Sequence, residues 1–208
     1  MIKVLNLYAG IGGNRKLWED VEVTAIENDK AIAAIYKDFF PKDKVIVTDA
    51  HEYLLNHYEE YDFIWSSPPC PSHSRIRFQQ AKLRKSFKNI YPDMKLYQEI
   101  IFLKHYFKGA WVVENVKGYY KPLIKPQELG RHFFWSNFNL GNYKHNKTII
   151  RDKYEILERT VGFKIKDFHN YKGDKRVLLR NCVDSKMAFH IFNMAFKETQ
   201  EVLKVNKG

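Results

Sequence analysis

The sequence has little cysteine and no long apolar run, and each shortage excludes a class of protein. Its 208 residues hold two cysteines, Cys70 and Cys182, far apart in the chain. Two cysteines do not make the disulfide framework of a small secreted domain, so we expect reduced thiols. No apolar run approaches the ~20 residues that a membrane-spanning helix needs, and the first residues lead into a strand-like run rather than a signal peptide. We expect a soluble, cytoplasmic protein that contacts no membrane.

Acidic residues are outnumbered. The chain has 24 Asp and Glu against 35 Lys and Arg, which gives a formal net charge of +11 and a pI near 9.4. Such an excess on a small chain is typical of proteins that bind a polyanion, most often nucleic acid, although a compositional bias towards solvated lysine produces the same number. Hydrophobic residues make up 45% of the chain, which is enough for the packed core of one domain.

Short apolar runs alternate with amphipathic stretches in the first half of the chain. This rhythm predicts an α/β fold, a mostly parallel sheet with helices on both faces. We expect strands at 2–8, 21–26, 45–47, 61–66 and 110–113, with helices after Asn14 and Asp29, at 51–58 and around 96–107. Later in the chain we expect strand or hairpin structure at 132–138 and 147–155, a last strand at 177–179 and a terminal helix at 186–203.

A glycine turn, Ala9-Gly10-Ile11-Gly12-Gly13, follows the first strand. Glycines let the backbone turn sharply and let a ligand approach the main chain. Arg15 stands where a dinucleotide fingerprint needs its third glycine, which argues against a bound diphosphate. Glu27 ends the second strand, where a carboxylate can accept hydrogen bonds from both ribose hydroxyls, and Asp49 follows the third strand. The pattern favours an adenosine-like ligand; alternatively, Glu27 and Asp49 only cap helices.

A cysteine and a glutamate follow the fourth and fifth strands, at the same expected sheet edge. Cys70 lies in a proline-rich loop beside His73, Arg75 and Arg77. Positive neighbours lower the pKa of a thiol and favour the thiolate nucleophile, whereas many free cysteines are simply small buried apolar residues. Glu114-Asn115-Val116 follows the fifth strand and adds a second carboxylate.

With these motifs the chain resembles the DNA cytosine 5-methyltransferases. The matches occur in the family's order and cover most of the chain: Leu7-Tyr8-Ala9-Gly10-Ile11-Gly12-Gly13 is similar to the cofactor motif, Pro69-Cys70 to the nucleophile motif, Glu114-Asn115-Val116 to the E-N-V motif and Arg180-Asn181-Cys182-Val183 to the late G-N-x-V motif. The resemblance implies a Rossmann-like methyltransferase fold with a cofactor-binding and catalytic core at 1–140, a reduced target-recognition segment at 141–176, and a strand and helix at 177–208 that return to the core.

The resemblance also implies a reaction. Cys70 would attack carbon 6 of a cytosine flipped out of double-stranded DNA, while Glu114 would hold and protonate the ring nitrogen next to the amine. Carbon 5 would then take a methyl group from S-adenosylmethionine, leaving S-adenosylhomocysteine. Arg131, the first arginine of a half-kept R-x-R motif, would orient the substrate unless it is a solvated surface residue. The implied cofactor contacts are Tyr8, Ala9, Gly10, Ile11, Gly12, Gly13, Glu27 on the ribose, Asn28, Asp49 on the adenine amine, Ala50, Pro69 and Asn181.

Several positions depart from the family's pattern. Asn6 stands in place of the usual Asp, Pro71 in place of Gln, and Arg180 in place of Gly. The largest departure is length, because only 141–176 is available to recognise the target. Its ten Lys and Arg and five Phe and Tyr suit phosphate and some base contacts, or the segment only completes the sheet. So short a segment predicts short or relaxed sequence specificity, or help from a protein partner or a homodimer.

A second basic stretch, 75–95, follows Cys70 directly. It carries seven Lys and Arg and one acid, Asp93. A mobile loop that closes over DNA and the flipped base needs such charge, although an ordinary solvated surface has it too. The expected DNA contacts are Ser74, Arg75, Arg77, Lys82, Arg84 and Lys85.

Three other functions stay open at this point. An amino-methyltransferase acting on adenine or cytosine amines would carry an aromatic residue where Cys70 stands after Ser-Pro-Pro. A non-catalytic DNA-binding relative would keep the fold without turnover, and an RNA cytosine methyltransferase would use the same chemistry. We expect no metal. The resemblance implies a bacterial or phage-infected cell and a role in restriction–modification or phage self-protection.

Overall fold

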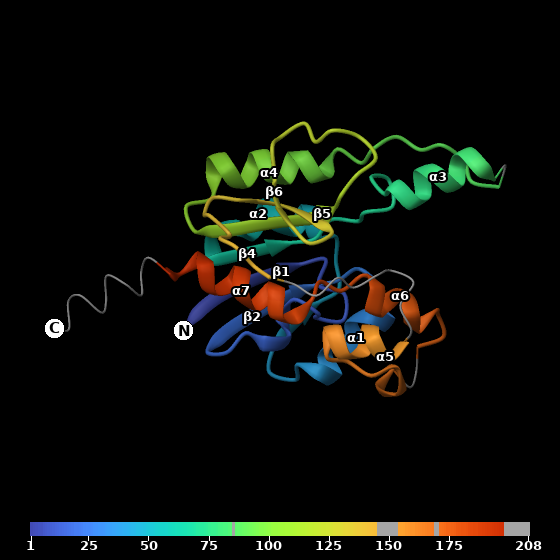
Figure 1. The fold of residues 1–208 in the computed structure, drawn as a ribbon. Coiled ribbons are helices and arrows are strands. Elements are labelled where there is room, and N and C mark those ends of the chain that lie inside the picture. Colours follow the sequence, from blue (N-terminus) through green and yellow to red (C-terminus); the bar gives the residue numbers. More distant parts are fainter. Residues whose placement is uncertain (85, 145–153, 169–170, 198–208) are drawn as a thin grey trace.

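The computed structural model describes the chain except for residues 85, 145–153, 169–170 and 198–208, and in that part it shows a mixed seven-stranded β-sheet (Figure 1). The strand order is β3-β2-β1-β4-β5-β7-β6. The pairings among β1 to β5 are parallel, whereas β7 runs antiparallel to both β5 and β6. The strands are β1 (Ile2–Leu7), β2 (Val21–Ile26), β3 (Lys44–Ile46), β4 (Phe63–Ser66), β5 (Ala110–Val116), β6 (Gln127–Leu129) and β7 (His132–Ser136).

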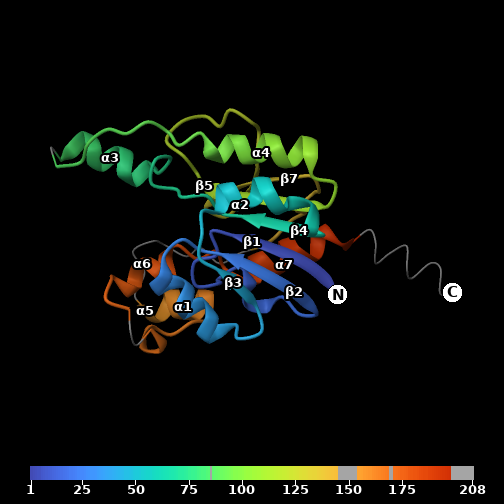
Figure 2. The same cartoon turned by 180° about the vertical axis from the view of Figure 1, so that it is seen from behind.

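Helices cover both faces of the sheet. In Figures 1 and 2, α2 and α4 lie over one face and α7 over the other, while α1, α5 and α6 form a group beside the β2–β3 side and α3 projects from the body. The helices are α1 (Lys30–Phe39), α2 (Ala50–His57), α3 (Arg75–Leu83), α4 (Lys95–Tyr106), α5 (Tyr154–Val161), α6 (Lys175–Arg180) and α7 (Ser185–Ala195), with 3₁₀ turns η1 (Arg15–Leu17), η2 (Tyr58–Glu60) and η3 (Ile165–Asp167).

The central strands are apolar on both faces because helices cover both sides of the sheet. Leu5 and Val113 belong to the apolar cluster that includes residues of α2 and α4, whereas Val4 and Val112 belong to the cluster that includes residues of α7. Successive side chains in a strand point to opposite faces. This alternation turns Glu114 towards the side of Val112.

The order in which strands are added to the sheet switches between β1 and β4. From β1 the sheet extends through β2 to β3 on one side, and from β4 it extends to β5 on the other. Open α/β sheets bind ligands at the carboxyl ends of the strands beside such a switch point. The glycine turn follows β1 and the cysteine loop follows β4. The topology therefore brings these two motifs to neighbouring strand ends.

The α/β fold class is confirmed, and β2 lies at the predicted residues. Asp29 caps α1 by accepting hydrogen bonds from the amides of Ala31 and Ile32. Asn14 also acts as a cap, but of a single 3₁₀ turn. Among the described residues, none of the helices has the length and apolar character that crossing a membrane requires.

Three predictions of local structure are wrong. The strand expected at 177–179 lies inside α6, which Asp174 caps and which buries Leu178 and Leu179. The strand expected at 147–155 has its only described residues in α5, and 147–153 lies outside the described residues. The basic stretch after Cys70, expected as a loop, begins with α3. In each case a short apolar or charged run does not distinguish helix from strand or loop. The terminal helix is described as α7, and 198–203 lies outside the described residues.

Candidate active site

The glycine turn is held against the end of β2 by Glu27. The amide of Gly10 donates to Glu27 Oε2 at 2.9 Å, and the amide of Asp29 donates to Oε1 at 3.0 Å. Gly10 has a φ of +56° and nothing within 4 Å of the position a Cβ would take, so the main chain is open to a ligand there. A carboxylate has about four lone-pair sites. Glu27 therefore keeps further acceptor sites beside the turn.

The late motif returns to the same turn. A Cβ on Gly13 would lie 2.5 Å from Cys182 Cβ, so only glycine permits this close approach. Cys182 is buried and its thiol contacts the carbonyl of Leu178, so it packs against the glycine turn as part of the core. Asn181 precedes it as the exposed C-cap of α6.

Asp49 caps a helix. Its Oδ1 accepts a hydrogen bond from the amide of Glu52 at 3.0 Å, and its Oδ2 lies 3.7 Å from Lys95 Nζ. The hydrogen bond from Glu52 and the charge of Lys95 lower the pKa of Asp49. The side chain is exposed, as is that of Asn28, whereas Ala50 is buried at the start of α2. The capping alternative thus describes Asp49, and an adenine contact would add to that role.

Cys70, Glu114 and Arg131 come together electrostatically. Burial and the Glu114 carboxylate raise the pKa of Cys70 to about 11, and the Arg131 guanidinium opposes that shift. Burial has the opposite effect on a cation and lowers the pKa of Arg131, whereas the negative charges of Glu114 and Cys70 oppose that shift. Arg131 Nη2 also donates to the carbonyl of Arg180 at 3.1 Å. Arg131 is therefore part of the site and no solvated surface arginine.

The prediction that nearby cations lower the pKa of Cys70 is wrong for the three residues named. Burial lowers the pKa of His73, whose Nδ1 contacts Tyr120 Oη at 2.6 Å, and so disfavours a positive charge on the imidazole. Arg75 Nε donates to the carbonyl of Gly118 at 2.7 Å, and its role is to hold the loop. The cation that acts on Cys70 is Arg131, which lies 61 positions later in the sequence.

Glu114 is buried beside Ser67 and the first residues of β7. Burial raises its pKa to about 7, while a hydrogen bond with Ser67 and the charge of Arg131 oppose the shift. His132 Nε2 lies 3.6 Å from Glu114 Oε1. A carboxyl group with this pKa is partly protonated near neutrality and can donate a proton. Sequence reasoning missed Ser67 and His132, because only the pairing of β5 with β7 places His132 there.

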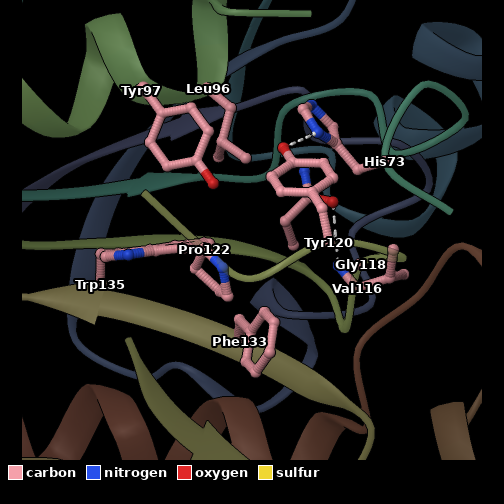
Figure 3. A pocket seen from close by; sticks show the side chains of 10 residues that line it. His73, Leu96, Tyr97, Val116, Gly118, Tyr120, Pro122, Phe133 and Trp135 are labelled. Carbon is pink, nitrogen blue, oxygen red and sulfur yellow. Dashed lines mark hydrogen bonds between the residues drawn. The ribbon is translucent and has the colours of Figure 1, made fainter. Parts of the chain in front are cut away.

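The nucleophile loop is tied to β5 on the opposite face. Asn115 Nδ2 donates to the carbonyl of Pro68 at 3.0 Å, and the amide of His73 donates to the carbonyl of Cys70. Figure 3 shows the pocket that His73 and Tyr120 help to line, with their hydrogen bond dashed. Neither Cys70 nor Glu114 lines this pocket, so it is separate from the proposed reacting groups.

The basic residues after Cys70 differ in their surroundings. Ser74 caps α3, and Arg77 Nη2 contacts the carbonyl of Lys88 at 3.4 Å. Lys82 Nζ lies 4.5 Å from the centre of the Phe78 ring, which stacks on Tyr119. Arg84 is exposed. Lys85 lies outside the described residues.

The expected recognition segment 141–176 contributes helices in its described part. Phe163 and Phe168 are fully buried in a cluster with Leu157 and Leu179, so these aromatic side chains are not available for base contacts. In both views α3 and the α5–α6 pair lie at the same end of the molecule (Figures 1 and 2).

Residues 2–161 match the family model described as C-5 cytosine-specific DNA methylase. The chain belongs to this family. It is a DNA (cytosine-5-)-methyltransferase, and the family predicted from the motifs is confirmed. No curated protein matches the sequence.

Several solved structures of methyltransferases are similar to the chain, and the one with a TM-score above 0.5 shows the same fold. The methyltransferase EhMeth of Entamoeba histolytica is 10% identical with a TM-score of 0.56, over 96% of this chain and 99% of that one. DNMT2 of Spodoptera frugiperda is 24% identical with a TM-score of 0.40, over 57% of this chain and 37% of that one. A putative DNA modification methyltransferase from an Escherichia coli prophage is 17% identical with a TM-score of 0.42, over 65% and 46%. Such low identities concern the fold alone.

One departure of this methylase from its family has a structural account. Asn6, in place of the usual acid, exchanges hydrogen bonds with Asn14: Asn14 Nδ2 donates to Asn6 Oδ1 at 2.7 Å, and Asn6 Nδ2 to Asn14 Oδ1 at 3.3 Å. Both side chains are buried, and a buried polar group needs such a partner. The pair fixes both ends of the glycine turn.

Proposed function

We propose that this methylase transfers a methyl group from S-adenosylmethionine to carbon 5 of cytosine in double-stranded DNA, through a covalent adduct with Cys70. The observation that carries the proposal is the grouping of Cys70, Glu114 and Arg131 beside the glycine turn. A thiol for attack, a carboxyl group that is part protonated near neutrality and a buried cation are the groups that addition to a cytosine ring needs.

The glycine turn suits the cofactor. The open space at Gly10 admits a ligand to the main chain, and Glu27 keeps acceptor sites beside it. The other residues proposed to hold the cofactor are Tyr8, Ala9, Ile11, Gly12, Gly13, Asn28, Asp49, Ala50, Pro69 and Asn181. When bound, S-adenosylmethionine supplies an electrophilic methyl group.

The chain's own residues then act on the base. The Cys70 thiolate forms a bond to carbon 6, and Glu114 donates its proton to the adjacent ring nitrogen so that no full negative charge builds up. Carbon 5 becomes nucleophilic and accepts the methyl group. Solvent then takes the carbon-5 proton, Cys70 leaves carbon 6 as a thiolate, and the ring nitrogen returns its proton to Glu114, which restores the ring. Cys70 and Glu114 together carry a negative charge during these steps, and Arg131 stabilises it.

Cytosine must leave the helix to reach Cys70, at a cost of a few kcal/mol. The cations on and after α3 would contact the phosphates, which fix the position of the protein on DNA without reading sequence. Because the segment 141–176 is short and two of its five aromatic residues, Phe163 and Phe168, are buried, we propose short or relaxed specificity, or a protein partner or homodimer that completes recognition. The free thiols of Cys70 and Cys182 suit a reducing cytoplasm.

The experiment that tests the reaction uses tritiated S-adenosylmethionine and duplex DNA containing 5-fluorocytosine, followed by a denaturing gel. Fluorine cannot leave carbon 5 as a proton does, so the Cys70 adduct is trapped and a labelled protein–DNA band is expected. Cys70→Ala should remove the band, and Cys182→Ala should keep it as the matched control.

Other results would overturn the proposal. Label on an exocyclic amine of plain DNA would assign an amino-methyltransferase. Label on RNA alone would change the substrate. No label on either, with DNA still bound, would assign a non-catalytic relative.

A further inference from the structure

A buried carboxylate that belongs to no motif lies beneath the proposed cofactor site. Glu99 in the middle of α4 is 1% exposed, and a carboxylate is seldom buried unless it is paired. Its Oε1 accepts a hydrogen bond from Tyr8 Oη at 2.6 Å and lies 3.0 Å from His51 Nδ1. Its Oε2 accepts a hydrogen bond from Ser66 Oγ. Three polar groups therefore converge on one side chain.

The three partners come from three segments of the site. Tyr8 follows β1 and opens the glycine turn, and Ser66 is the last residue of β4, just before the loop of Cys70. His51 lies in the first turn of α2, two residues after Asp49. Helix α4 itself carries none of the proposed cofactor contacts. Glu99 thus joins, from one side, the segments that must keep their relative positions when a nucleoside binds.

Tyr8 gives this link a specific purpose. Its φ is +55°, a left-handed conformation that is uncommon for a residue with a Cβ. Such a conformation persists only where the surroundings hold it. The amide of the next residue, Ala9, donates to the carbonyl of Ile26, and the Tyr8 hydroxyl is held by Glu99. The main chain after Tyr8 and the end of its side chain are therefore both held in place. These contacts also fix the start of the glycine turn.

We propose that Glu99 is a positioning residue of the cofactor site, which holds Tyr8 and His51 in place for binding of the adenosine part of S-adenosylmethionine. The inference rests on the proposed function for the identity of the ligand. The contact with Glu99 also raises the pKa of His51, as an ion pair of the two side chains requires. A mere packing role would need no acceptor at this position.

Two substitutions at Glu99 test the proposal. Glu99→Leu fills the space without an acceptor, so it should raise the KM for S-adenosylmethionine roughly tenfold or more, since buried donors lose a charged partner. The kcat and the KM for DNA should stay within about threefold. Glu99→Gln keeps an acceptor for Tyr8 and should restore most of the affinity. The Kd for S-adenosylhomocysteine, measured by calorimetry, should follow the KM.

Tyrosine variants provide a matched pair. Tyr8→Phe removes the hydroxyl that Glu99 binds. Tyr61→Phe removes a half-buried hydroxyl that pairs with the hydroxyl of Tyr53 at 3.1 Å. Tyr61 lies just before β4, at the end of the sheet away from the proposed cofactor site. Tyr8→Phe should weaken binding of S-adenosylhomocysteine several-fold, and Tyr61→Phe should not. This pair and Glu99→Gln carry the test if Glu99→Leu does not fold.

The outcomes separate this inference from the proposed reaction. A lower melting temperature for Glu99→Leu with wild-type Kd and KM would show a purely structural role and overturn the proposal, as would equal effects of the two tyrosine variants. If the wild type binds S-adenosylhomocysteine and the variants weaken it, the inference holds even where no cytosine is methylated. If the wild type binds neither S-adenosylmethionine nor S-adenosylhomocysteine, the inference fails together with the cofactor.

Discussion

Replacing Glu114 by glutamine should stabilise the protein while it lowers the rate of methylation. Burial raises the pKa of Glu114 from 4.5 to about 7, so the folded state disfavours the ionised carboxylate. The resulting loss of folding stability is absent below about pH 4.5. It grows between about pH 4.5 and 7, where Glu114 ionises in the unfolded chain, and is complete above that range. A shift of this size amounts to about 3 kcal/mol at pH 8.5 and about 1 kcal/mol at pH 5.5.

Glutamine avoids this cost because its amide is neutral at every pH, and its oxygen can still accept the hydrogen bond with Ser67. Glu114→Gln should therefore raise the free energy of unfolding by about 3 kcal/mol at pH 8.5, or roughly 6–12 °C in Tm for a chain of this size. The gain should shrink by more than half at pH 5.5. Because glutamine has no proton to donate, the methylation rate should fall about 10²- to 10⁴-fold.

The assay is urea unfolding of both proteins at pH 5.5, 7 and 8.5, alongside methyl transfer to DNA. Glu128→Gln is the control, since its carboxylate is 57% exposed beside Lys117 and a surface pair contributes at most about 1 kcal/mol. Equal stability of Glu114→Gln and wild type at pH 8.5, with the same dependence on pH, would refute the reasoning that burial perturbs Glu114.

Other changes probe the remaining parts of the site. Arg131→Gln should raise the pKa of Cys70 further, because it removes the cation that opposes the shift; the rate of thiol alkylation against pH measures this, and an unchanged profile would contradict it. Glu27→Gln should weaken S-adenosylhomocysteine binding about tenfold in calorimetry, through loss of a charged acceptor; wild-type affinity would exclude the proposed ribose contact. Replacing Arg77 and Lys82 by glutamine should make the binding constant for DNA less dependent on salt. The plot of its logarithm against log salt concentration should become less steep by about 0.9 per lost phosphate contact, and an unchanged slope would mean that DNA does not contact these residues.

Local signals account for what the sequence predicts correctly. The run at 21–26 is apolar, bounded by polar residues and followed by the capping Asp29, and the structure has β2 and α1 there. The run Val177-Leu178-Leu179 is too short to carry a period, and its packing against α1 and α5 makes it helical. Long-range packing thus decides where the local pattern is short.

The chemistry of the site depends on contacts that a sequence pattern does not reveal. Arg75 and Arg77 are close to Cys70 in sequence but are bound to backbone carbonyls. Arg131 acts on Cys70 only because β7 pairs with β5. Glu99 meets Tyr8 across 91 positions. Motifs therefore predict which groups react, whereas the pKa values of these groups and the contacts that hold them follow only from the fold.

The protonation states of Cys70 and Glu114 are the reverse of those that the proposed reaction needs, and this affects how the rate depends on pH. Addition to the base needs the thiolate of Cys70 together with protonated Glu114, but pKa values of about 11 and about 7 favour thiol and carboxylate. The reactive arrangement is therefore a minor one between those two values, and its share changes little with pH there because gain of thiolate offsets loss of carboxylic acid. Below about pH 7 the share falls tenfold per pH unit. The rate of adduct formation should therefore rise up to about pH 7 and stay flat above it.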